Sequence, residues 1–278
     1  MRSTESTPTK NRFGSDGPTT SVVVAAYNQP RELALVLSAL AAQSDGCFDV
    51  WIADDGSDPP ASETVASLRA ELPVPVDCVW QPDQGFRKMR AQNLAALRSK
   101  AELLLFCDGD CVPWRNWVET YRRAARRGEF LVGGYVFLDE DETRRLTPDA
   151  VRRGAHERRL DAATWWRLHA AHWRNLLYAG RRRNRPRIRG GNFGVARDLF
   201  ERVGGFDEAF AGYGKEDSEL RNRMRVAGAR GISLWHRARL CHLSTRVFPG
   251  VPRPPTPRDL YEASFGRIQA RTGLSSHA

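Results

Sequence analysis

The sequence predicts an α/β fold, a mainly parallel sheet flanked by helices, with a ligand site at the carboxyl ends of its strands. Two observations lead to this prediction. Short apolar runs alternate with helical segments from residue 21 to residue 126, an order typical of parallel strands joined by right-handed crossovers. Polar residues follow each apolar run directly, and because parallel strands end at one edge of the sheet, we expect these residues to meet there.

The first elements follow from local residue patterns. Residues 1–20 are rich in Ser, Thr, Gly and Pro and are predicted to form a loose tail. Ser21–Ala25 is a β-branched run suited to a buried strand, and Pro30 fits the first turn of a helix with one apolar face. The same patterns predict a helix over 30–43, a strand over 48–53, a helix over 60–71, a strand over 76–81, a helix over 88–97 and a strand over 103–107.

The pattern changes after the strand at 103–107. Pro113 is expected to open a helix that runs to Arg126, because proline is favoured in the first turn of a helix. Beyond Gly133 the alternation of strands and helices lapses. Polar and apolar residues alternate again over Ile232–Leu243, which predicts one late strand.

The composition indicates a globular protein with an anionic partner. The chain of 278 residues is 41% hydrophobic, enough for one large core. Its net charge of +10 favours a nucleotide, a phosphate, a nucleic acid or a membrane surface as partner. Five scattered cysteines do not suit a disulfide framework, so we expect reduced thiols and a cytoplasmic location. No apolar stretch approaches the roughly 18 residues that cross a bilayer, so any membrane contact is expected to be peripheral, at the inner face.

The residues after the first two strands suggest a nucleotide site. Ala26, Tyr27 and Asn28 form a turn that offers free backbone amides and an aromatic ring for a base. Asp54 or Asp55 could accept a hydrogen bond from the ring N–H of a pyrimidine. The alternative for Asp54 is the ordinary one of capping the helix that follows it.

The loop after the third strand adds polar groups to the same edge. It contains Gln84 and Arg87, and the Arg87 guanidinium could pair with a phosphate or simply remain solvated. The first strand is not followed by the glycine pattern of a Rossmann dinucleotide site, and the chain contains no Walker A loop. A nucleotide bound here would therefore be held by another type of site.

Two carboxylates one residue apart suggest a metal site. Asp108, Gly109 and Asp110 end the apolar run of the fourth strand, and carboxylates there can bind a divalent cation that also contacts phosphate oxygens. The alternative is an ordinary Asp-Gly turn. His242, on the late strand, could complete the site, and a set of carboxylate, imidazole and phosphate ligands suits Mn²⁺, with Mg²⁺ as the second choice.

A segment rich in arginine and tryptophan occupies residues 139–189. Its apolar residues recur at roughly helical spacing, which predicts an amphipathic helix on the core with a solvated basic face. A functional alternative is that its Trp and Arg side chains line an acceptor groove or touch anionic lipid. Nucleic acid is not the expected partner, because no known nucleic-acid-binding motif accompanies the charge. The histidines at 156, 169 and 172 are expected to serve packing or the surface.

Two glycines and an amide open the next informative stretch. Gly190 and Gly191 allow the backbone to approach a ligand closely, and Asn192 can both donate and accept hydrogen bonds. Further on, Tyr213 and Gly214 belong to a glycine-rich aromatic loop. These residues are candidates for contacts with a substrate.

The loop leads into two acidic residues, Glu216 and Asp217, at the start of a predicted helix. Carboxylates are favoured at a helix N-terminus by its exposed amides, so a purely structural role is one reading. The other reading is that one carboxylate acts as the general base for a substrate hydroxyl.

Taken together, these motifs resemble glycosyltransferases of family 2 with the GT-A fold, and the C-terminal half resembles galactosyltransferases. The resemblance extends from about Ser21 to His242. It rests on the order and spacing of seven motifs: ADDGS at 53–57, DQGFR at 83–87, FCDGDCVP at 106–113, RGGNFG at 189–194, GGFDE at 204–208, GYGKED at 212–217 and CHL at 241–243.

The resemblance implies a role for each candidate residue. The metal would be bound by Asp110 and His242, with Asp217 as general base and Glu216 beside it positioning the acceptor, together with Tyr213 and Gly214. The donor, most simply a UDP-sugar, would meet the following residues: Ala26, Tyr27, Asn28, Asp54, Asp55, Gln84, Arg87, Asp108, Gly109, Asp110, Gly191 and Asn192. Transfer would invert the anomeric configuration in one displacement.

The implied domain plan has three parts. Residues 21–248 would form one GT-A domain, divided into a nucleotide-sugar half (21–137), a helical insert (138–188) and a catalytic and acceptor half (189–248). Residues 249–278 would form a proline-rich tail with a short helix near 258–271. The acceptor could be a sugar, a lipid-linked intermediate, a peptide or a small natural product.

Some positions depart from the family pattern, and two other functions are compatible with parts of the sequence. Lys215 stands where many galactosyltransferase relatives have Gly, and Gln92 stands where many family 2 members have Arg. One alternative function is a sugar nucleotidyltransferase, but that class usually has a basic, glycine-rich loop after the first strand. The other is a polyanion-binding module, which would not require acidic residues at several strand ends.

Overall fold

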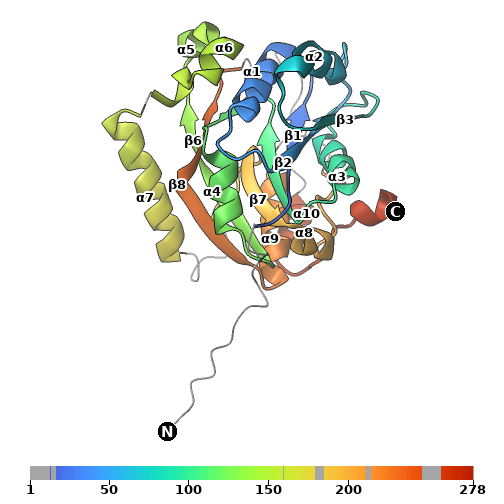
Figure 1. Ribbon diagram of the computed structural model, residues 1–278. Helices are drawn as coiled ribbons and strands as arrows, with labels where there is room; N and C mark the ends of the chain where they lie inside the picture. Colours follow the sequence, from blue (N-terminus) through green and yellow to red (C-terminus); the bar gives the residue numbers. More distant parts are fainter. Residues whose placement is uncertain are drawn as a thin grey trace.

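An eight-stranded sheet with helices on both faces forms the centre of the described part of the chain (Figure 1). The computed structural model describes residues 13, 17–158, 160–178, 185–210, 214–245 and 258–277. The strand order is β3-β2-β1-β4-β7-β6-β8-β5. This confirms the predicted fold class, an α/β fold with a mainly parallel sheet in its first half.

The first half of the sheet consists of four parallel strands. They are β1 (Thr20–Ala26), β2 (Phe48–Asp54), β3 (Val76–Trp80) and β4 (Leu103–Asp108). β1 pairs with both β2 and β4, so Val22 lies between Val50 and Leu105. Both faces of these strands are covered by helices, which is why they read as apolar runs rather than as alternating patterns.

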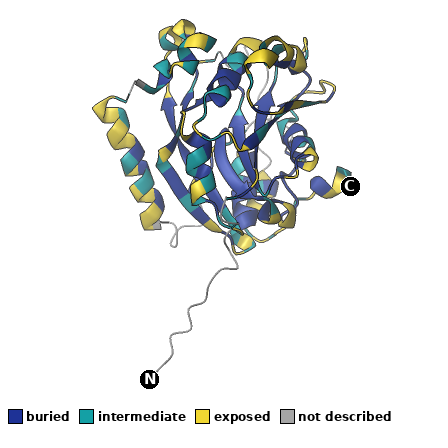
Figure 2. Cartoon of the chain, in the orientation of Figure 1, coloured by how far each residue is buried: buried dark blue, intermediate teal, exposed yellow. Residues whose placement is uncertain are grey.

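Two groups of helices cover the two faces. One face carries α1 (Pro30–Ala41), α2 (Ala61–Leu68) with a 3₁₀ turn (Arg69–Glu71), and α4 (Trp117–Ala124); the other carries α3 (Lys88–Arg98), α8 (Arg197–Arg202) and α9 (Glu216–Val226). Successive residues of β1 enter opposite cores: Val22 and Val24 pack on the α1 side, and Val23 packs on the α3 side. The sheet is therefore buried on both faces (Figure 2).

The second half of the sheet is mixed. It contains β5 (Cys111–Pro113), β6 (Glu129–Phe137), β7 (Asn192–Ala196) and β8 (Arg230–His242). β7 runs antiparallel to β4 and to β6, whereas β6 and β8 are parallel. The short β5 pairs antiparallel with the end of β8, so that Cys111 lies opposite His242. This pairing brings the late strand to the acidic turn after β4.

The prediction of a helix from Pro113 to Arg126 is wrong in its start. Pro113 ends β5, where it lies opposite Leu240, and the helix spans only Trp117–Ala124. β5 is an edge strand, the position in a sheet where proline is tolerated. Its pairing partner lies about 130 residues further along the chain, so local pattern could not reveal it.

The expected lapse of the sheet beyond Gly133 is also wrong. β6 continues to Phe137, with a register shift between Gly133 and Gly134 where it pairs with β8. The two glycines hide the strand from pattern analysis because they have no side chain to contribute. They are needed for close packing, since a Cβ at Gly134 would overlap the Trp235 carbonyl group.

The described part of residues 138–188 contains helical elements and no strand. These elements are α5 (Glu140–Arg145), α6 (Pro148–Arg152), a 3₁₀ turn (Ala155–Arg158) and α7 (Ala162–Tyr178). The expected helix near 258–271 is shorter than predicted: α10 spans Arg258–Ala263, and a 3₁₀ turn follows at Leu274–His277. Most of the predicted N-terminal tail and residues 246–257 lie outside the described residues. No helix in the described ranges is both long and apolar enough to cross a membrane.

Candidate active site

The Asp-Gly-Asp turn joins β4 to β5 and is held against the end of β1. The Gly109 amide donates a hydrogen bond of 2.8 Å to the Ala25 carbonyl oxygen. A Cβ at position 109 would lie 2.8 Å from that oxygen, so only glycine fits there without a shift of the backbone. The turn therefore fixes Asp108 and Asp110 at the edge of the sheet where β1, β2, β3 and β4 all end.

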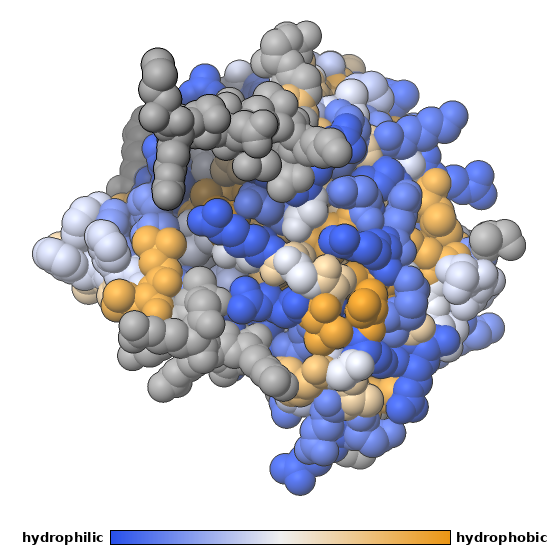
Figure 3. All heavy atoms as spheres, turned by 90° about the horizontal axis from the view of Figure 1, so that it is seen from below, coloured by the Kyte–Doolittle hydropathy of each residue, from blue (hydrophilic) through white to orange (hydrophobic). Residues whose placement is uncertain are grey.

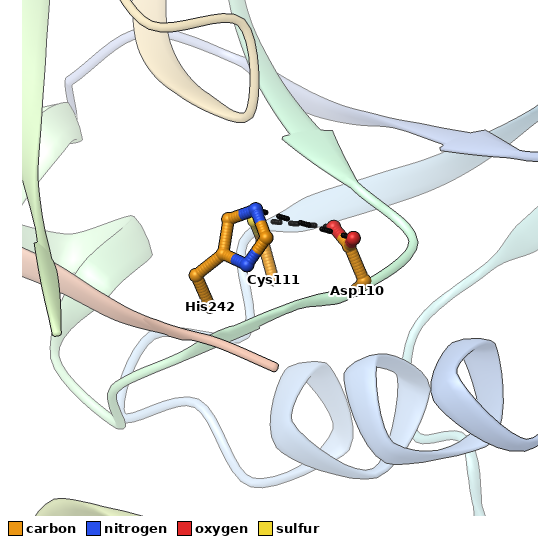
Figure 4. A group of neighbouring side chains, drawn as sticks. All are labelled: Asp110, Cys111 and His242. Carbon is orange, nitrogen blue, oxygen red and sulfur yellow. Dashed lines mark hydrogen bonds and ion pairs between the residues drawn. The ribbon is translucent and has the colours of Figure 1, made fainter. Parts of the chain in front are cut away.

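Asp110 and His242 form the centre of a group of three possible metal ligands, with Cys111 as the third (Figure 4). The His242 Nε2 atom lies 4.0 Å from an Asp110 carboxylate oxygen, and the Thr245 hydroxyl donates a 3.1 Å hydrogen bond to the same carboxylate. His242 Nδ1 lies 2.8 Å from the Leu243 carbonyl oxygen. A carbonyl can only accept, so Nδ1 carries the proton and the lone pair of Nε2 is directed toward the group.

The ionisation of this group favours oxygen and nitrogen as ligands. Burial and the neighbouring Asp108 raise the pKa of Asp110, and His242 opposes the increase. Burial and the same two carboxylates raise the pKa of the Cys111 thiol well above its usual value, so it stays protonated. A thiolate is the form that binds metal. The donor set is thus one carboxylate and one imidazole, which fits Mn²⁺ or Mg²⁺ completed by phosphate oxygens.

Lys88 is a site residue that the sequence analysis did not identify. It is the first residue of α3, and its ammonium group forms an ion pair with Asp108. Burial lowers the pKa of Lys88, but the charges of Asp108, Asp217 and Glu216 outweigh this effect and raise it. Lys88 therefore remains charged and faces both acidic motifs. Its position directly after the strand-end loop was the signal that could have revealed it.

The Asp217 carboxyl has a strongly raised pKa. It lies in the first turn of α9, and burial, the adjacent Glu216 and Asp108 raise its pKa to about 8, against the opposing effect of Lys88. Glu216 accepts a 2.7 Å hydrogen bond from the Gly214 amide. A carboxylate with a pKa near neutrality is well matched to proton transfer.

The Gly190-Gly191 segment connects the acidic turn with Asp217. A Cβ on Gly190 would lie 2.8 Å from an Asp217 carboxylate oxygen, and one on Gly191 would lie 2.7 Å from an Asp108 oxygen. The backbone at these glycines therefore contacts both carboxylates, as only residues without side chains allow. Motifs about 100 residues apart in the sequence thus form one site.

Asn192 does not face this site, contrary to the expectation that its side chain meets the donor. It is fully buried, and its amide oxygen accepts hydrogen bonds of 2.8 Å from Trp117 and from Tyr121. Its amide nitrogen donates to the carbonyl groups of Gly134 and Ala238. With every polar atom paired inside the core, the Asn192 side chain ties strands together and has no group left for a ligand.

The residues after β1 and β2 form hydrogen-bonded turns. Asn28 has a positive φ of 50°, its amide donates to the Ser57 hydroxyl, and its side-chain oxygen accepts from the Asp58 amide. The Asp54 carboxylate accepts from the Ser57 amide and hydroxyl and from the Ala61 amide at the start of α2. Asp54 therefore has the capping role considered as its alternative.

Asp55 lies next to Asp54 but makes different contacts. It accepts hydrogen bonds from the Gln81 side chain at 2.6 Å and from the Arg87 amide at 2.8 Å, and burial raises its pKa. The Arg87 guanidinium donates to the Pro82 carbonyl oxygen, while its buried Nε atom has no hydrogen-bond partner among the described residues. These contacts hold the loop after β3 against the end of β2.

The remaining candidates are placed as follows. Ala26 ends β1, and its carbonyl oxygen accepts from the Asp55 amide. The Tyr27 hydroxyl donates to Asp83, which binds it to the loop that also carries the exposed Gln84. Tyr213 lies outside the described residues.

A polar hollow of about 460 Å³ adjoins these groups. Its lining includes Asn28 in the turn after β1 and Thr245, the hydroxyl partner of Asp110, and α5 contributes another wall. The volume lies in the range of small-molecule sites. The hollow therefore extends from the turn after β1 to Thr245, which hydrogen-bonds to the possible metal ligand Asp110.

The Arg189 side chain makes cation–π contacts with a group of aromatic rings, one of which neighbours His242. The Arg189 guanidinium lies 5.7–5.8 Å from the ring centres of Tyr135, Phe137 and Trp235. The Phe137 ring in turn lies 5.4 Å from that of His242. In the sequence, Arg189 stands out only as part of the RGGNFG motif, because its three aromatic partners lie on β6 and β8, more than 40 residues away along the chain.

Comparison with known proteins agrees with this architecture. The family model described as glycosyl transferase family 2 matches residues 21–204, which is more than half of the chain. A second model, described as N-terminal domain of galactosyltransferase, matches residues 173–246. The two matches together contain the acidic turn, Gly190-Gly191, Asp217 and His242.

Two curated proteins share moderate sequence similarity with the chain. Validoxylamine A glucosyltransferase of Streptomyces hygroscopicus subsp. jinggangensis (strain 5008) is 29% identical over 223 residues, which cover 76% of this chain and 52% of that protein. Chondroitin synthase of Escherichia coli is 27% identical over 227 residues, which cover 75% of this chain and 32% of that protein. The chain thus spans about half or less of the length of these relatives.

Two solved structures share the fold at low sequence identity. The mannosyltransferase PcManGT from Pyrobaculum calidifontis, in complex with GDP-Man and Mn²⁺, superposes with a TM-score of 0.58 at 16% identity, covering 90% of this chain and 70% of that one. S. aureus TarS 1–349, in complex with UDP, gives a TM-score of 0.54 at 16% identity, covering 82% and 61%. At this identity the likeness concerns the fold.

Proposed function

The chain belongs to glycosyl transferase family 2, and on that premise we propose that it moves a sugar from a nucleoside-diphosphate sugar, most simply a UDP-sugar, to an acceptor hydroxyl with inversion at the anomeric carbon. One observation carries the proposal. Gly190 and Gly191 contact Asp217 and Asp108 respectively, so a carboxylate suited to proton transfer adjoins the turn that carries the possible metal ligand Asp110.

The donor is proposed to lie across the strand ends of the first half of the sheet. The hollow between Asn28 and Thr245 supports this placement, because it runs from the turn after β1 to the partner of Asp110. Asp55 is the proposed acceptor for the ring N–H of uracil, since Asp54 is engaged at the start of α2. Structural relatives bind UDP and GDP-Man, so nucleoside diphosphates are the ligand class to test first.

Asp110 and His242 are proposed to bind a divalent cation, preferably Mn²⁺. When bound, such an ion stabilises the negative charge of a leaving diphosphate as a Lewis acid. The Leu243 carbonyl oxygen fixes the tautomer of His242, and Thr245 orients the Asp110 carboxylate. Lys88 holds Asp108 in place beside them.

Asp217 is proposed to be the general base. Its raised pKa means that it binds the proton of an acceptor hydroxyl more strongly than an ordinary carboxylate would. Glu216, held by the Gly214 amide, is proposed to orient the acceptor. Attack from the side opposite the diphosphate, with no covalent intermediate, gives the inverted product.

The two alternative functions have weaker support. A sugar nucleotidyltransferase would need a loop for a triphosphate after β1, but the residues there form a short turn with Asn28 tied to Ser57 and Asp58. A polyanion-binding module would not need the Asp108, Asp217 and Lys88 arrangement, in which the positive charge is used internally.

Isothermal titration tests the donor and metal sites directly. UDP, GDP, ADP and TDP would be titrated into the protein with and without Mn²⁺. We expect one diphosphate, UDP, to bind tightly and only with metal. If none of the four binds in a metal-dependent manner, the glycosyltransferase site as described is wrong. Binding of ADP instead, whose adenine ring has no N–H to donate, would keep the reaction but reject the role given to Asp55.

A further inference from the structure

α7 presents an apolar face to solvent. Figure 2 shows the helix exposed along its outer side, at the margin of the molecule where Figure 1 places it. Of the ten large hydrophobic side chains that are exposed in the described ranges, five belong to this one helix: Trp165, Trp166, Trp173, Leu176 and Leu177. Trp166, Trp173 and Leu177 are the most exposed, at 66%, 60% and 65%.

The inner face of α7 packs against the sheet, and this packing determines which side chains of the helix point toward solvent. Leu168 and Ala171 are buried against the sheet, and α7 contacts β8 and β6. The Asn175 side chain donates a 3.2 Å hydrogen bond to the Ser233 hydroxyl on β8. Because this side is already packed, the outer tryptophans cannot turn inward without breaking the contact between α7 and β8.

The outer residues form one continuous stripe. Trp166, Trp173 and Leu177 recur at intervals of seven and four residues, which places them on one side of a helix, opposite Leu168. Folding gains nothing from apolar groups left in water, and contiguous exposed apolar surface marks an interaction site. In Figure 3, hydrophobic side chains are visible at the margin on the side where α7 stands in Figure 1.

The charge beside the stripe identifies its partner. Arg167 and Arg174 are exposed, and the segment Ala162–Tyr178 contains no acidic residue. Arginines next to an apolar stripe complement anionic lipid headgroups, and tryptophan prefers the interface between lipid and water. A symmetric contact between two copies would instead bring the arginines of both helices together in a chain of net charge +10, which like-charge repulsion disfavours.

We propose that α7 is an interfacial helix that docks the protein on an anionic membrane surface, with its Trp166, Trp173 and Leu177 side chains inserted among the headgroups. This inference does not depend on the proposed reaction. It assigns the arginine- and tryptophan-rich segment to lipid contact rather than to a solvated basic face. The protein would lie on the bilayer and would not cross it.

Co-sedimentation with lipid vesicles tests the proposal. One vesicle preparation contains phosphatidylcholine alone, and the other contains phosphatidylcholine mixed with phosphatidylglycerol. We expect binding to the mixed vesicles to be tighter by about tenfold or more, since each arginine near an anionic surface contributes about fivefold. Trp166→Ser combined with Trp173→Ser should reduce that binding by about tenfold or more. Arg167→Gln combined with Arg174→Gln should remove the preference for anionic lipid.

Matched controls exploit exposed residues elsewhere. Trp80→Ser removes a tryptophan that is 51% exposed on β3, at the opposite edge of the sheet, and Arg98→Gln removes an exposed arginine on α3. Both controls should bind the mixed vesicles like the unmodified protein, and melting temperatures should show that all variants are folded. Equal binding to both vesicle types, or full binding by the double tryptophan variant, would overturn the proposal. The proposal would also be overturned if sedimentation velocity showed the unmodified protein as a dimer and the double tryptophan variant as a monomer, while neither protein bound vesicles.

Discussion

The acidic residues of the site differ in environment, and this difference divides their proposed roles. Asp108 is paired with Lys88, Asp110 faces the free nitrogen of His242, and Asp217 has a pKa raised to about 8. Groups whose pKa values are pushed apart by their surroundings are suited to different tasks. At this scale, Asp217 is the residue whose replacement is most informative.

Replacing Asp217 by Asn should lower kcat by about 100-fold to 10,000-fold, because the amide cannot accept the proton of the acceptor. The dissociation constant for UDP with Mn²⁺ should stay unchanged. Asp198→Asn is the matched control, since Asp198 is an exposed aspartate in the first turn of α8. Steady-state kinetics and titration measure both effects. Turnover that survives in Asp217→Asn would exclude Asp217 as the base.

The pH dependence follows from the same carboxylate. The base must be deprotonated, and its pKa is raised from the ordinary value near 3.8 to about 8, so kcat/KM should fall as the pH drops below about 8. The Glu216 charge contributes to this increase. Glu216→Gln should therefore shift the acidic limb of the profile to lower pH, whatever it does to the maximal rate. An acidic limb near pH 4 in the unmodified enzyme would contradict the assignment.

At the scale of elements, short glycine segments bring the motifs together. Gly109 lets the acidic turn lie on β1, and Gly190 and Gly191 let the segment before β7 contact carboxylates on α9 and β4. Lys215 precedes α9 with a φ of 68°, the left-handed conformation that glycine adopts without strain. Its ammonium group lies 4.4 Å from the Tyr261 ring centre, a contact that glycine would lack.

Gly190→Ala tests the contact between the glycine segment and α9. The added methyl group would lie 2.8 Å from an Asp217 oxygen and displace the carboxylate. We expect kcat to fall by about 100-fold, the effect typical of a misplaced catalytic group. Gly46→Ala is the control, because a Cβ there meets nothing within 4 Å. If kinetics show both variants equally active, Gly190 does not set the position of Asp217.

A second prediction at this scale concerns the contact of α7 with β8. The His172 and His236 rings lie 4.0 Å apart, with His169, Arg237 and Arg239 nearby. Burial and these positive neighbours lower the pKa of His236 to about 4. Its neutral form is thus favoured by folding, so this contribution to stability is complete above pH 6.5 and is lost as the pH falls toward 4.

Thermal melts at pH 7.5 and pH 5 would measure the effect. The melting temperature should fall more between pH 7.5 and pH 5 in the unmodified protein than in the His236→Gln variant, because the variant has no imidazole at position 236 to protonate. Other acid-sensitive groups are common to both proteins and cancel in the comparison. An equal loss in both would show that this histidine pair does not titrate in the transition.

For the whole molecule, the site lies where the two halves of the sheet meet. β4 supplies the acidic turn from the parallel half, and β8 supplies His242 from the mixed half; β5, which follows the turn, pairs with β8. A ligand that bridges Asp110 and His242 would therefore connect residues about 130 positions apart in the chain. Binding there should stabilise the entire fold.

Mn²⁺ with UDP should raise the melting temperature, with about 2.7 kcal/mol gained at a ligand concentration of 100 times the dissociation constant. Asp110→Ala should remove this gain, because it deletes a proposed metal ligand. Cys111→Ala should retain it, since the Cys111 thiol stays protonated, although its loss from the core lowers the starting stability. Differential scanning calorimetry with and without EDTA would measure both. Loss of the gain in Cys111→Ala alone would reverse the assignment of ligands.

The local sequence pattern was sufficient to predict the parallel half of the sheet and the types of residue that form the site. The alternation of apolar runs and helices predicted β1, β2, β3 and β4 to within one residue at each end, because each strand is buried on both faces and reads as apolar. The polar residues at the strand ends were predicted to meet because parallel strands share an edge. The order and spacing of the motifs identified the family, which the family model confirms.

Only the tertiary structure decided which residues occupy the site and which support it. Asn192 is an amide next to the glycines in sequence, yet its partners Trp117, Tyr121 and Ala238 draw it into the core. Lys88, by contrast, enters the site because Asp108 and Asp217 approach it from two other elements. Pairings between residues far apart in the chain leave no periodic trace in either segment, so the inclusion of Pro113 in β5 could not be predicted. The sequence alone determined the chemistry available to this protein, and long-range pairing decided its arrangement.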